Sequence, residues 1–544
     1  MKKEVFYGEE NQVEEKECVE ERKETDKKQE DNQEVEEKKN EKIRDFGQAI
    51  LHANRNDRVI YLLSIIGEIE GHECLPSNAK TTKYEHVLPG AVYLAGTGEA
   101  WIAVGLLIGT ILNWYIVSAR LRKYTIVAGN SLTIPSFFKN RYRDHKNIIK
   151  IVSASIIAVF FTVYTASAFS SGAKLFATLF SDSASGDENY NRVYVIGLIV
   201  AAVVILVYTF MGGFKAVCTT DLIQGLMMIV AILSVPVLAY AILTFDTGFS
   251  SALAAKGVEQ PAQFLNFFVN GDGTPVSAVS IISNLAWGLG YFGMPHILVR
   301  FMAVKSNEEI KKSRKIAVVW VIISLTASCL IGLIARGYLT AQLDDATSES
   351  VFIRTIQQLF SGNGVLIFIG GIFLCGILAA IMSTADSQLL VTASAVSEDL
   401  YKGAVKKNAS EKSSLLVGKI AVAVVAVIAF FIALNPKSSI MGLVSDAWAG
   451  FGSAFGPVVL LALFWKRSTL SGAISGMATG ALTVIIWDYI PLVNGQTLYA
   501  ATNLYSLVVG FGLALIVNVV VSLLSKKPSK EIIDEFDSIK NIEV

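Results

Sequence analysis

The chain has 544 residues, a mean hydropathy of +0.49 and equal numbers of basic and acidic side chains, 47 of each. The charges are segregated: the first 45 residues hold 28 of the 94 charges, and the remainder is too poor in charge for an ordinary soluble protein. This distribution indicates a polytopic membrane protein, and we expect no nucleic-acid partner.

The N-terminal part does not resemble a membrane domain. Residues 1–57 are rich in Glu, Lys, Gln and Asn, so we expect a disordered segment, and no apolar run of a signal peptide is present. Residues 58–99 form an atypical segment, because the apolar run 59–67 is too short to span a bilayer and 68–87 is polar. Membrane-like sequence begins at Leu88.

Residues 100–524 form the predicted transmembrane domain, and residues 525–544 form a short tail. Eleven apolar stretches in this domain are long enough to cross about 30 Å of hydrocarbon. They lie near residues 100–118, 149–172, 193–211, 222–243, 277–298, 316–335, 365–394, 415–434, 439–465, 469–490 and 503–524. We therefore predict an all-α polytopic protein with about 11 transmembrane helices.

The charges of the loops predict the orientation. One set of alternate loops carries 24 basic residues and the other set carries five. Because basic loops remain in the cytoplasm, the C-terminus is expected inside.

Residues 286–303, AWGLGYFGMPHILVRFMA, combine three glycines and Pro295 within an apolar stretch. Broken backbone is tolerated at membrane depth where protein or a water-filled cavity covers it, and transporters bind solutes at such breaks. Trp287 and Tyr291 are four residues apart, so a helix would place them on one face. The pattern predicts an aromatic-lined substrate site on a broken helix. The alternative is a packing helix kinked at Pro295.

The sequence holds no GxSxG, HExxH, P-loop or dinucleotide-binding motif, so we predict no enzyme, no catalytic residues and no cofactor. Its five cysteines are odd in number and contain no CxxC pair, which favours small packing residues over a metal or disulfide framework.

Several segments together resemble the solute:sodium symporter family. They are LPGAVYLAGTGEAWIAVGLLIG (88–109), FFTVYTAS (160–167), YTFMGGFKAVCTTDLIQ (208–224), WGLGYFGMPHILVRFMA (287–303), GILAAIMSTADSQLLVTASAVSEDLYKG (376–403) and GLVSDAWAGFGSAFGPVVL (442–460). They follow the family's order over about 80% of the chain. The sixth-span motif and the SEDLY segment are similar to the proline-transporting branch.

The resemblance implies a LeuT-type core of two inverted five-helix repeats. Members of the family usually carry two further helices before the LPGA segment, and the second of these is the first core helix, with a motif like SDMSGW. This sequence has no such motif, and 68–87 stands in its place. The first core helix, which would supply sodium ligands, is therefore expected to be lost.

Ala380, Ser383 and Thr384 share one face of a helix, and their oxygens suit sodium, a hard cation. The resemblance places the family's sodium site at these residues. The alternative is that the hydroxyls bond to carbonyls of their own helix.

The resemblance likewise places proline against Tyr164, Trp287, Tyr291 and Pro295. Asp221 and Asp386 are candidates for the ion pathway. Asp221 is alternatively a helix-start acid, and Asp386 a structural partner of a helix end. Arg300 is most simply interpreted as a cytoplasmic anchor.

These features predict sodium-coupled symport of a small amino acid, with L-proline first, across the cell membrane by alternating access. Sodium, the solute and the lipid bilayer are the expected partners. Two alternatives stay open. One is a symporter for another small solute, such as pantothenate, a sugar or a betaine. The other is a transport-inactive remnant or frameshifted product, which the missing first core helix favours.

Overall fold

The computed structural model describes residues 88–181, 188–246, 248–304, 306–345, 347–406, 409–435 and 440–539. The expectations for residues 1–57 and 58–87, including the loss of the first core helix, lie outside these ranges.

Ten helices in the described ranges are long and apolar enough to cross a membrane. They are the bent helix Leu88–Val127, α7 (Ile148–Phe180), two stretches of α8 (Glu188–Val207 and Thr220–Phe245), α13 (Asn307–Tyr338), α15 (Gly364–Ser394) with its continuation to Gly403, α16 (Glu411–Ala433), α17 (Ile440–Phe464), α18 (Leu470–Tyr489) and α20 (Ser506–Leu524). The predicted class of α-helical membrane protein is confirmed.

The eleventh predicted stretch is present as a broken helix. It consists of α11 (Ala278–Ala286), the 3₁₀ turn η3 (Trp287–Phe292) and α12 (Pro295–Ala303). None of the three pieces is long enough to span a bilayer alone.

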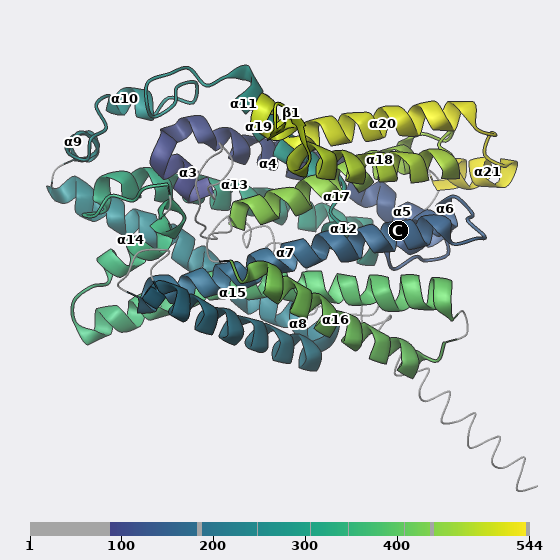
Figure 1. Cartoon of the computed structure of the whole chain (residues 1–544), viewed down its shortest axis with the longest axis horizontal. Helices are drawn as coiled ribbons and strands as arrows, with labels where there is room; N and C mark the ends of the chain where they lie inside the picture. The colour runs from purple at the N-terminus through teal and green to yellow at the C-terminus, as the bar shows by residue number, and fades with distance from the viewer. Residues whose placement is uncertain are drawn as a thin grey trace, which may run out of the picture. The chain divides into compact units, whose positions relative to one another are not determined.

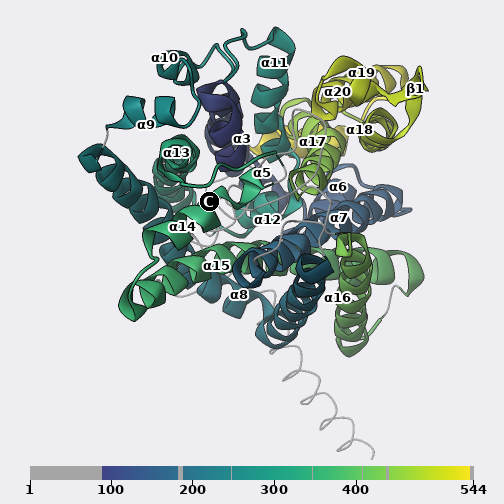
Figure 2. The ribbon, with the colours of Figure 1, turned by 60° about the vertical axis from the view of Figure 1, so that its left-hand side comes forward.

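Short helices lie at the ends of the bundle. They are α6 (Ile134–Arg141), α9 (Phe249–Ala255), α10 (Pro261–Phe264), α14 (Val351–Leu359), α19 (Leu498–Thr502) and α21 (Lys530–Ser538). Figure 1 shows α9, α10 and α14 at one end of the long helices and α6 and α21 at the other. Figure 2 shows the same helices turned, with α15 and α16 on the side away from α11.

The first span begins at Leu88 rather than near residue 100, and it bends twice. It runs through α3 (Leu88–Ala95), the 3₁₀ turn η1 (Gly96–Ala100), α4 (Trp101–Leu112), the π-helical turn η2 (Asn113–Val117) and α5 (Ser118–Val127). Gly96 has a φ of +78°, and a Cβ there would lie 2.4 Å from the carbonyl oxygen of Phe264. Glycine is needed at the first bend for both reasons.

Helix α8 (Glu188–Asp246) holds two spans because it runs across the bundle and returns. Near its start, Gly197 packs against Phe176 close to the end of α7. Near its finish, Leu243 packs against Gly337 close to the end of α13. A straight helix of 59 residues would measure about 88 Å, far more than a bilayer.

Polar side chains mark where many helices begin. Each of these residues accepts a hydrogen bond from the backbone N–H three positions later, which satisfies a donor that the helix itself leaves open. They are Thr133, Ser277, Ser306, Asn363, Ser410 and Thr469.

One short hairpin departs from the all-α prediction. Strand β1 (Pro491–Val493) pairs antiparallel with β2 (Gln496–Thr497) through Asn494 and Gly495. Both turn residues have positive φ, 49° and 78°, which is the turn that an Asn-Gly pair favours.

Helix α21 docks on the end of the bundle where α6 lies. Its Phe536 is buried beneath the guanidinium groups of Arg120 and Arg141, at 5.2 and 5.4 Å from the ring. Glu535 pairs with Arg143 at 2.8 Å. Burial raises the pKa of the Glu535 carboxyl, and the neighbouring Arg143 opposes this shift.

The orientation expected from loop charges can be tested at two exposed residues. In a variant without the native cysteines, His145→Cys in the loop after α6 should react with a membrane-impermeant maleimide in inside-out vesicles. Glu259→Cys, between α9 and α10, should react in intact cells; both residues are exposed. Labelling of His145→Cys in intact cells would reverse the assigned orientation.

Candidate functional site

The break between α11 and α12 is built from the residues that the sequence pattern singled out. The chain makes a 3₁₀ turn from Trp287, Gly293 N–H bonds to the carbonyl of Gly290 at 2.8 Å, and Met294 is extended. Helix α12 then begins with Pro295 at its first position, where its lack of an N–H carries no cost.

Trp287 and Tyr291 belong to one aromatic cluster, but not because they share a helix face. The chain forms a 3₁₀ turn here, in which residues three apart align, rather than the α-helix that the prediction assumed. Trp448 of α17 joins them instead: its ring centroid is 6.2 Å from Trp287 and 5.1 Å from Tyr291. Tyr505 stacks on Trp287 at 5.2 Å.

Trp448 also forms a hydrogen bond with the backbone of the broken helix. Its indole N–H donates to the carbonyl of Trp287 at 2.8 Å. Asn113 in the π-helical turn of the first span donates to the carbonyl of Tyr291 at 3.0 Å. Pro295 has no N–H for the Tyr291 carbonyl four residues earlier, so Asn113 supplies a bond that the interrupted helix cannot make. Trp448 adds a bond to the turn.

Tyr164 and Pro295 lie in a second group around α7 and α12. The ring of Tyr164 is 6.5 Å from that of His296, the neighbour of Pro295, and Phe161 is 5.6 Å from His296. Phe161 in turn contacts Phe451 of α17 at 4.4 Å. Helix α17 therefore touches both groups, through Trp448 and Phe451.

The sequence reasoning missed Trp448, Tyr505 and His296. Trp448 falls inside the family-like segment 442–460, and His296 directly follows Pro295. The position of each residue in the sequence could therefore have identified it as a candidate. Nothing in the sequence identified Tyr505, because it lies more than 200 residues from Trp287 in the chain.

The three predicted sodium ligands are buried on α15, with exposures of 1% for Ala380, 0% for Ser383 and 3% for Thr384. Ser383 Oγ donates to the carbonyl of Ala380 at 3.1 Å, so the back-bonding alternative holds for this hydroxyl. The Thr384 hydroxyl has no hydrogen-bond partner among the described residues.

Two other threonines in these helices are satisfied by their own backbone, whereas Thr165 of α7 is buried without a hydrogen-bond partner in the described part of the chain, as Thr384 is. Thr392, on the same helix, donates to the carbonyl of Gln388 at 2.7 Å, and Thr162 on α7 donates to that of Ala158 at 2.6 Å. A buried hydroxyl left unbonded costs about 1–3 kcal/mol. Thr384 thus offers an oxygen that a bound cation could use.

Asp221, Arg300 and Ser387 form a buried polar group next to these residues. Arg300 Nη2 lies 3.6 Å from Asp221 Oδ2 and donates to Ser387 Oγ at 3.0 Å. Ser387 follows Ser383 by one helical turn. Arg300 is only 4% exposed, so its interpretation as a cytoplasmic anchor was wrong. Asp386 is fully buried on the same helix.

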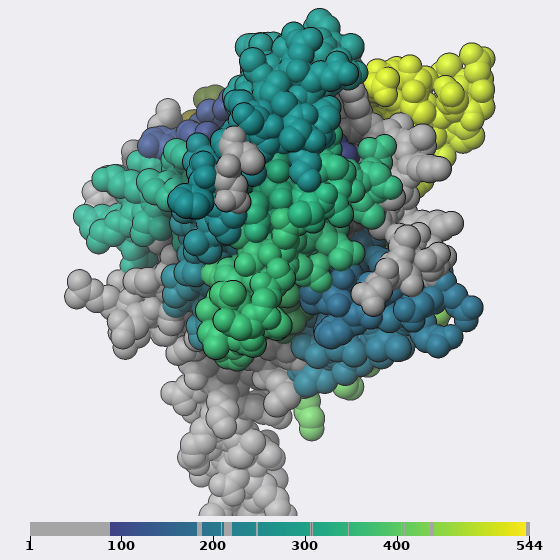
Figure 3. All heavy atoms as spheres, turned by 90° about the vertical axis from the view of Figure 1, so that its left-hand side faces the viewer, coloured from purple at the N-terminus to yellow at the C-terminus, as the bar shows by residue number. Residues whose placement is uncertain are grey.

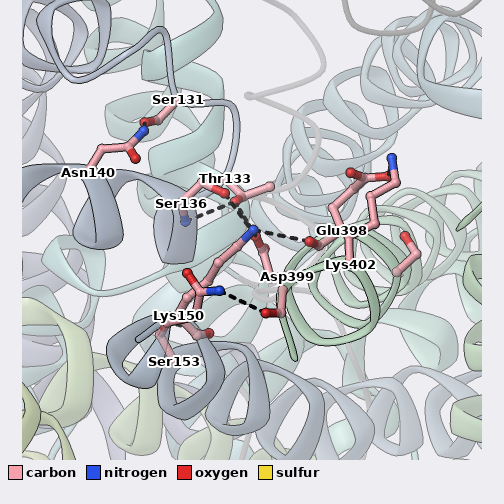
Figure 4. A network of polar contacts seen from close by, with 12 residues as sticks. Ser131, Thr133, Ser136, Asn140, Lys150, Ser153, Glu398, Asp399 and Lys402 are labelled. Atoms are coloured by element: carbon pink, nitrogen blue, oxygen red, sulfur yellow. Dashed lines mark hydrogen bonds and ion pairs between the residues drawn. The ribbon is translucent and has the colours of Figure 1, made fainter. Parts of the chain in front are cut away.

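A second ion pair fixes the segment that follows α15, the π-helical stretch η5 (Ala395–Val405). Asp399 pairs with Lys150 of α7 at 3.1 Å and accepts hydrogen bonds from Thr133 and Ser136 at 3.1 and 2.9 Å (Figure 4). Because a buried carboxylate must be paired, this part of the SEDLY segment holds η5 against α6 and α7.

No group of three His, Cys, Asp or Glu side chains in the described ranges could hold a metal ion. The oxygens on α15 are hydroxyl and carbonyl groups, which suit a hard monovalent cation better than a transition metal.

In the described ranges, ten membrane-length helices and one broken helix beside the polar face of α15 form an arrangement that is typical of membrane transporters. The model of the sodium:solute symporter family matches residues 86–480, and the chain belongs to this family. The resemblance found in the sequence is confirmed.

Curated relatives agree with this assignment. The sodium/proline symporter of Staphylococcus aureus is 42% identical over 463 residues, which cover 84% of this chain and 85% of the relative. The sodium/proline symporter of Staphylococcus aureus strain Newman matches with the same identity and coverage.

Among solved structures, a Na⁺-coupled sialic acid symporter in a substrate-bound, outward-open state has a TM-score of 0.62 and 17% sequence identity. The match covers 86% of this chain and 91% of that chain. The fold is thus the LeuT-type transporter fold, as predicted.

Gly290→Ala should disrupt the broken helix. A Cβ at residue 290 would lie 2.0 Å from Trp448 Nε1, so the indole must move and release the carbonyl of Trp287. Overpacking and the lost hydrogen bond should together destabilise the fold by about 2–4 kcal/mol, visible as a lower unfolding temperature in detergent.

Gly512→Ala is the matched control, because nothing lies within 4 Å of a Cβ at that position on α20. It should leave the unfolding temperature unchanged or slightly higher. Equal stability of the two variants would show that Trp448 does not hold the break.

Proposed function

We propose that this chain moves proline across the cell membrane together with sodium, by alternating access and with its C-terminus in the cytoplasm. The proposal is supported by membership of the sodium:solute symporter family and by the names of the curated relatives. The charges of the loops support the orientation.

The observation that carries the proposal is the Thr384 hydroxyl. It is buried without a hydrogen-bond partner among the described residues, one position after Ser383 and one turn after Ala380. Sodium between these oxygens would replace the missing hydrogen bond. We assign the sodium site to Ala380, Ser383 and Thr384.

We assign the solute to the aromatic groups at the break. Trp287, Tyr291 and Tyr164 have flat rings of the kind that suits a small ring, and a ring face attracts an ammonium group. Pro295 begins α12, whose N-terminal N–H groups favour a carboxylate. One compact zwitterion would use all of these features.

Asp221 and Asp386 are assigned to the path of the ion. Arg300 already pairs with Asp221, so a cation that reaches Asp221 must compete with a guanidinium. Coupling would follow if this pair opened in a second conformation, because sodium would then bind the two conformations with different affinities. No covalent bond changes in this cycle, and the sodium gradient supplies the free energy.

Uptake by the purified 544-residue chain in lipid vesicles tests the proposal. An inward sodium gradient should drive radiolabelled proline above its equilibrium level, and an equal potassium gradient should not. Accumulation of pantothenate, a sugar or a betaine in place of proline would redirect the solute assignment. Failure to accumulate any of them would support the transport-inactive alternative.

Thr384→Val tests the sodium site, because valine keeps the shape and removes the oxygen. The sodium concentration for half-maximal uptake should rise at least tenfold, equivalent to about 1.4 kcal/mol. Thr162→Val is the control, since that hydroxyl bonds its own helix. A sodium dependence that is identical in both variants would remove Thr384 from the site.

A further inference from the structure

An apolar cavity of about 470 Å³ lies between the end of α7, helix α14 and the first half of α15. Its walls include Phe176 and Leu179 of α7, Phe360 after α14, and Ile367, Leu374 and Leu378 of α15. Figure 3 views the end of the molecule where α14 lies and shows the green α14–α15 region beside the teal segment of α9 and α10.

Phe360 fixes one wall of this cavity. Its ring packs on Phe373 of α15 at 5.1 Å, and a Cβ at Gly370 would lie 2.8 Å from its Cβ. The cavity is therefore formed by side chains packed between α14 and α15, rather than by the shallow surface of a single helix.

The cavity opens on an apolar surface formed by helices of membrane-spanning length. Phe180, Ile367 and Cys375 line the cavity, and all three side chains are exposed. The exposed fraction is 68% for Phe180 and 59% for Ile367. All three residues belong to membrane-spanning helices. Such residues meet acyl chains in a bilayer. Water would find few hydrogen-bond partners among these walls, so it is a poor occupant.

The length of the cavity along α15 matches the thickness of one leaflet of the hydrocarbon core. From Ile367 to Leu378 helix α15 rises about 16 Å, roughly half of the 30 Å hydrocarbon core. The polar lining side chains, Gln357 and Ser361, lie at the α14 end, where α15 is about to begin. The cavity is thus polar at one rim and apolar along one leaflet depth.

We propose that this cavity binds one acyl chain of a membrane phospholipid, with the polar group of the lipid beside Gln357 and Ser361. The proposed orientation makes this the outer leaflet. Because α14 is not a membrane span, an acyl chain seated here would tie an extramembrane helix to two spanning helices, α7 and α15.

Photo-crosslinking tests the proposal without any measurement of transport. The full chain is reconstituted in phosphatidylcholine–phosphatidylglycerol vesicles that contain a phosphatidylcholine with a diazirine on one acyl chain, and adducts are mapped by mass spectrometry. Adducts should be at least fivefold more abundant on residues 367–378 than on the lipid-facing helix α16.

Gly371→Leu should fill the cavity. Gly371 lines it, and nothing lies within 4 Å of a Cβ there, so the added side chain enters open space. Adducts on residues 367–378 should fall at least fivefold. Gly512→Leu, which also projects into open space but on α20, should leave them unchanged.

Cys375→Trp offers a second way to fill the cavity if Gly371→Leu does not insert. Equal adduct density on α15 and α16 in the unmodified chain would mean ordinary lipid contact and would overturn the proposal. So would unchanged adducts in a correctly folded Gly371→Leu or Cys375→Trp chain.

Discussion

Hydrogen bonds from two side chains, Trp448 and Asn113, stabilise the backbone of the broken helix. Lipid offers no donors or acceptors, so an interrupted backbone must find them in the protein. Trp448 and Asn113 provide them from α17 and from the first span. Because the same indole contacts Trp287 and Tyr291, the group that satisfies the backbone also positions the rings assigned to the solute.

Buried charges follow a comparable arrangement. Arg300 meets Asp221 and a serine, and Lys150 meets Asp399, which two hydroxyls also contact. Removing one member of such a pair would leave an uncompensated charge at low dielectric. The first pair joins α12, α8 and α15, and the second joins η5 to α7. Helix α15 is therefore held by a hydrogen bond from the paired Arg300, and its continuation η5 by an ion pair.

Local features of the sequence predicted the spans and the break. Apolar length identified the spanning helices, and the glycines with Pro295 identified where one of them is interrupted. What failed depended on partners distant in sequence. Arg300 was assigned to the surface because its partners Asp221 and Ser387 are distant in the sequence and cannot be predicted from the residues around it. The shared face of Trp287 and Tyr291 assumed 3.6 residues per turn, and the 3₁₀ turn changed that spacing.

The candidate sodium site could be predicted from the sequence only in part. The spacing of Ala380, Ser383 and Thr384 placed three oxygens together from sequence, yet it could not separate the two hydroxyls. Packing separates them, since Ser383 bonds its own helix and Thr384 does not.

The docking of α21 has a consequence for biosynthesis. Phe536 covers Arg120 and Arg141, which leave the ribosome about 400 residues earlier. At roughly 5–20 residues per second, synthesis of the intervening chain takes about 20–80 s. During that interval Arg120 of α5 and Arg141 of α6 lack this partner and are accessible to chaperones or to premature contacts. This end of the helical bundle is completed only when α21 has been made.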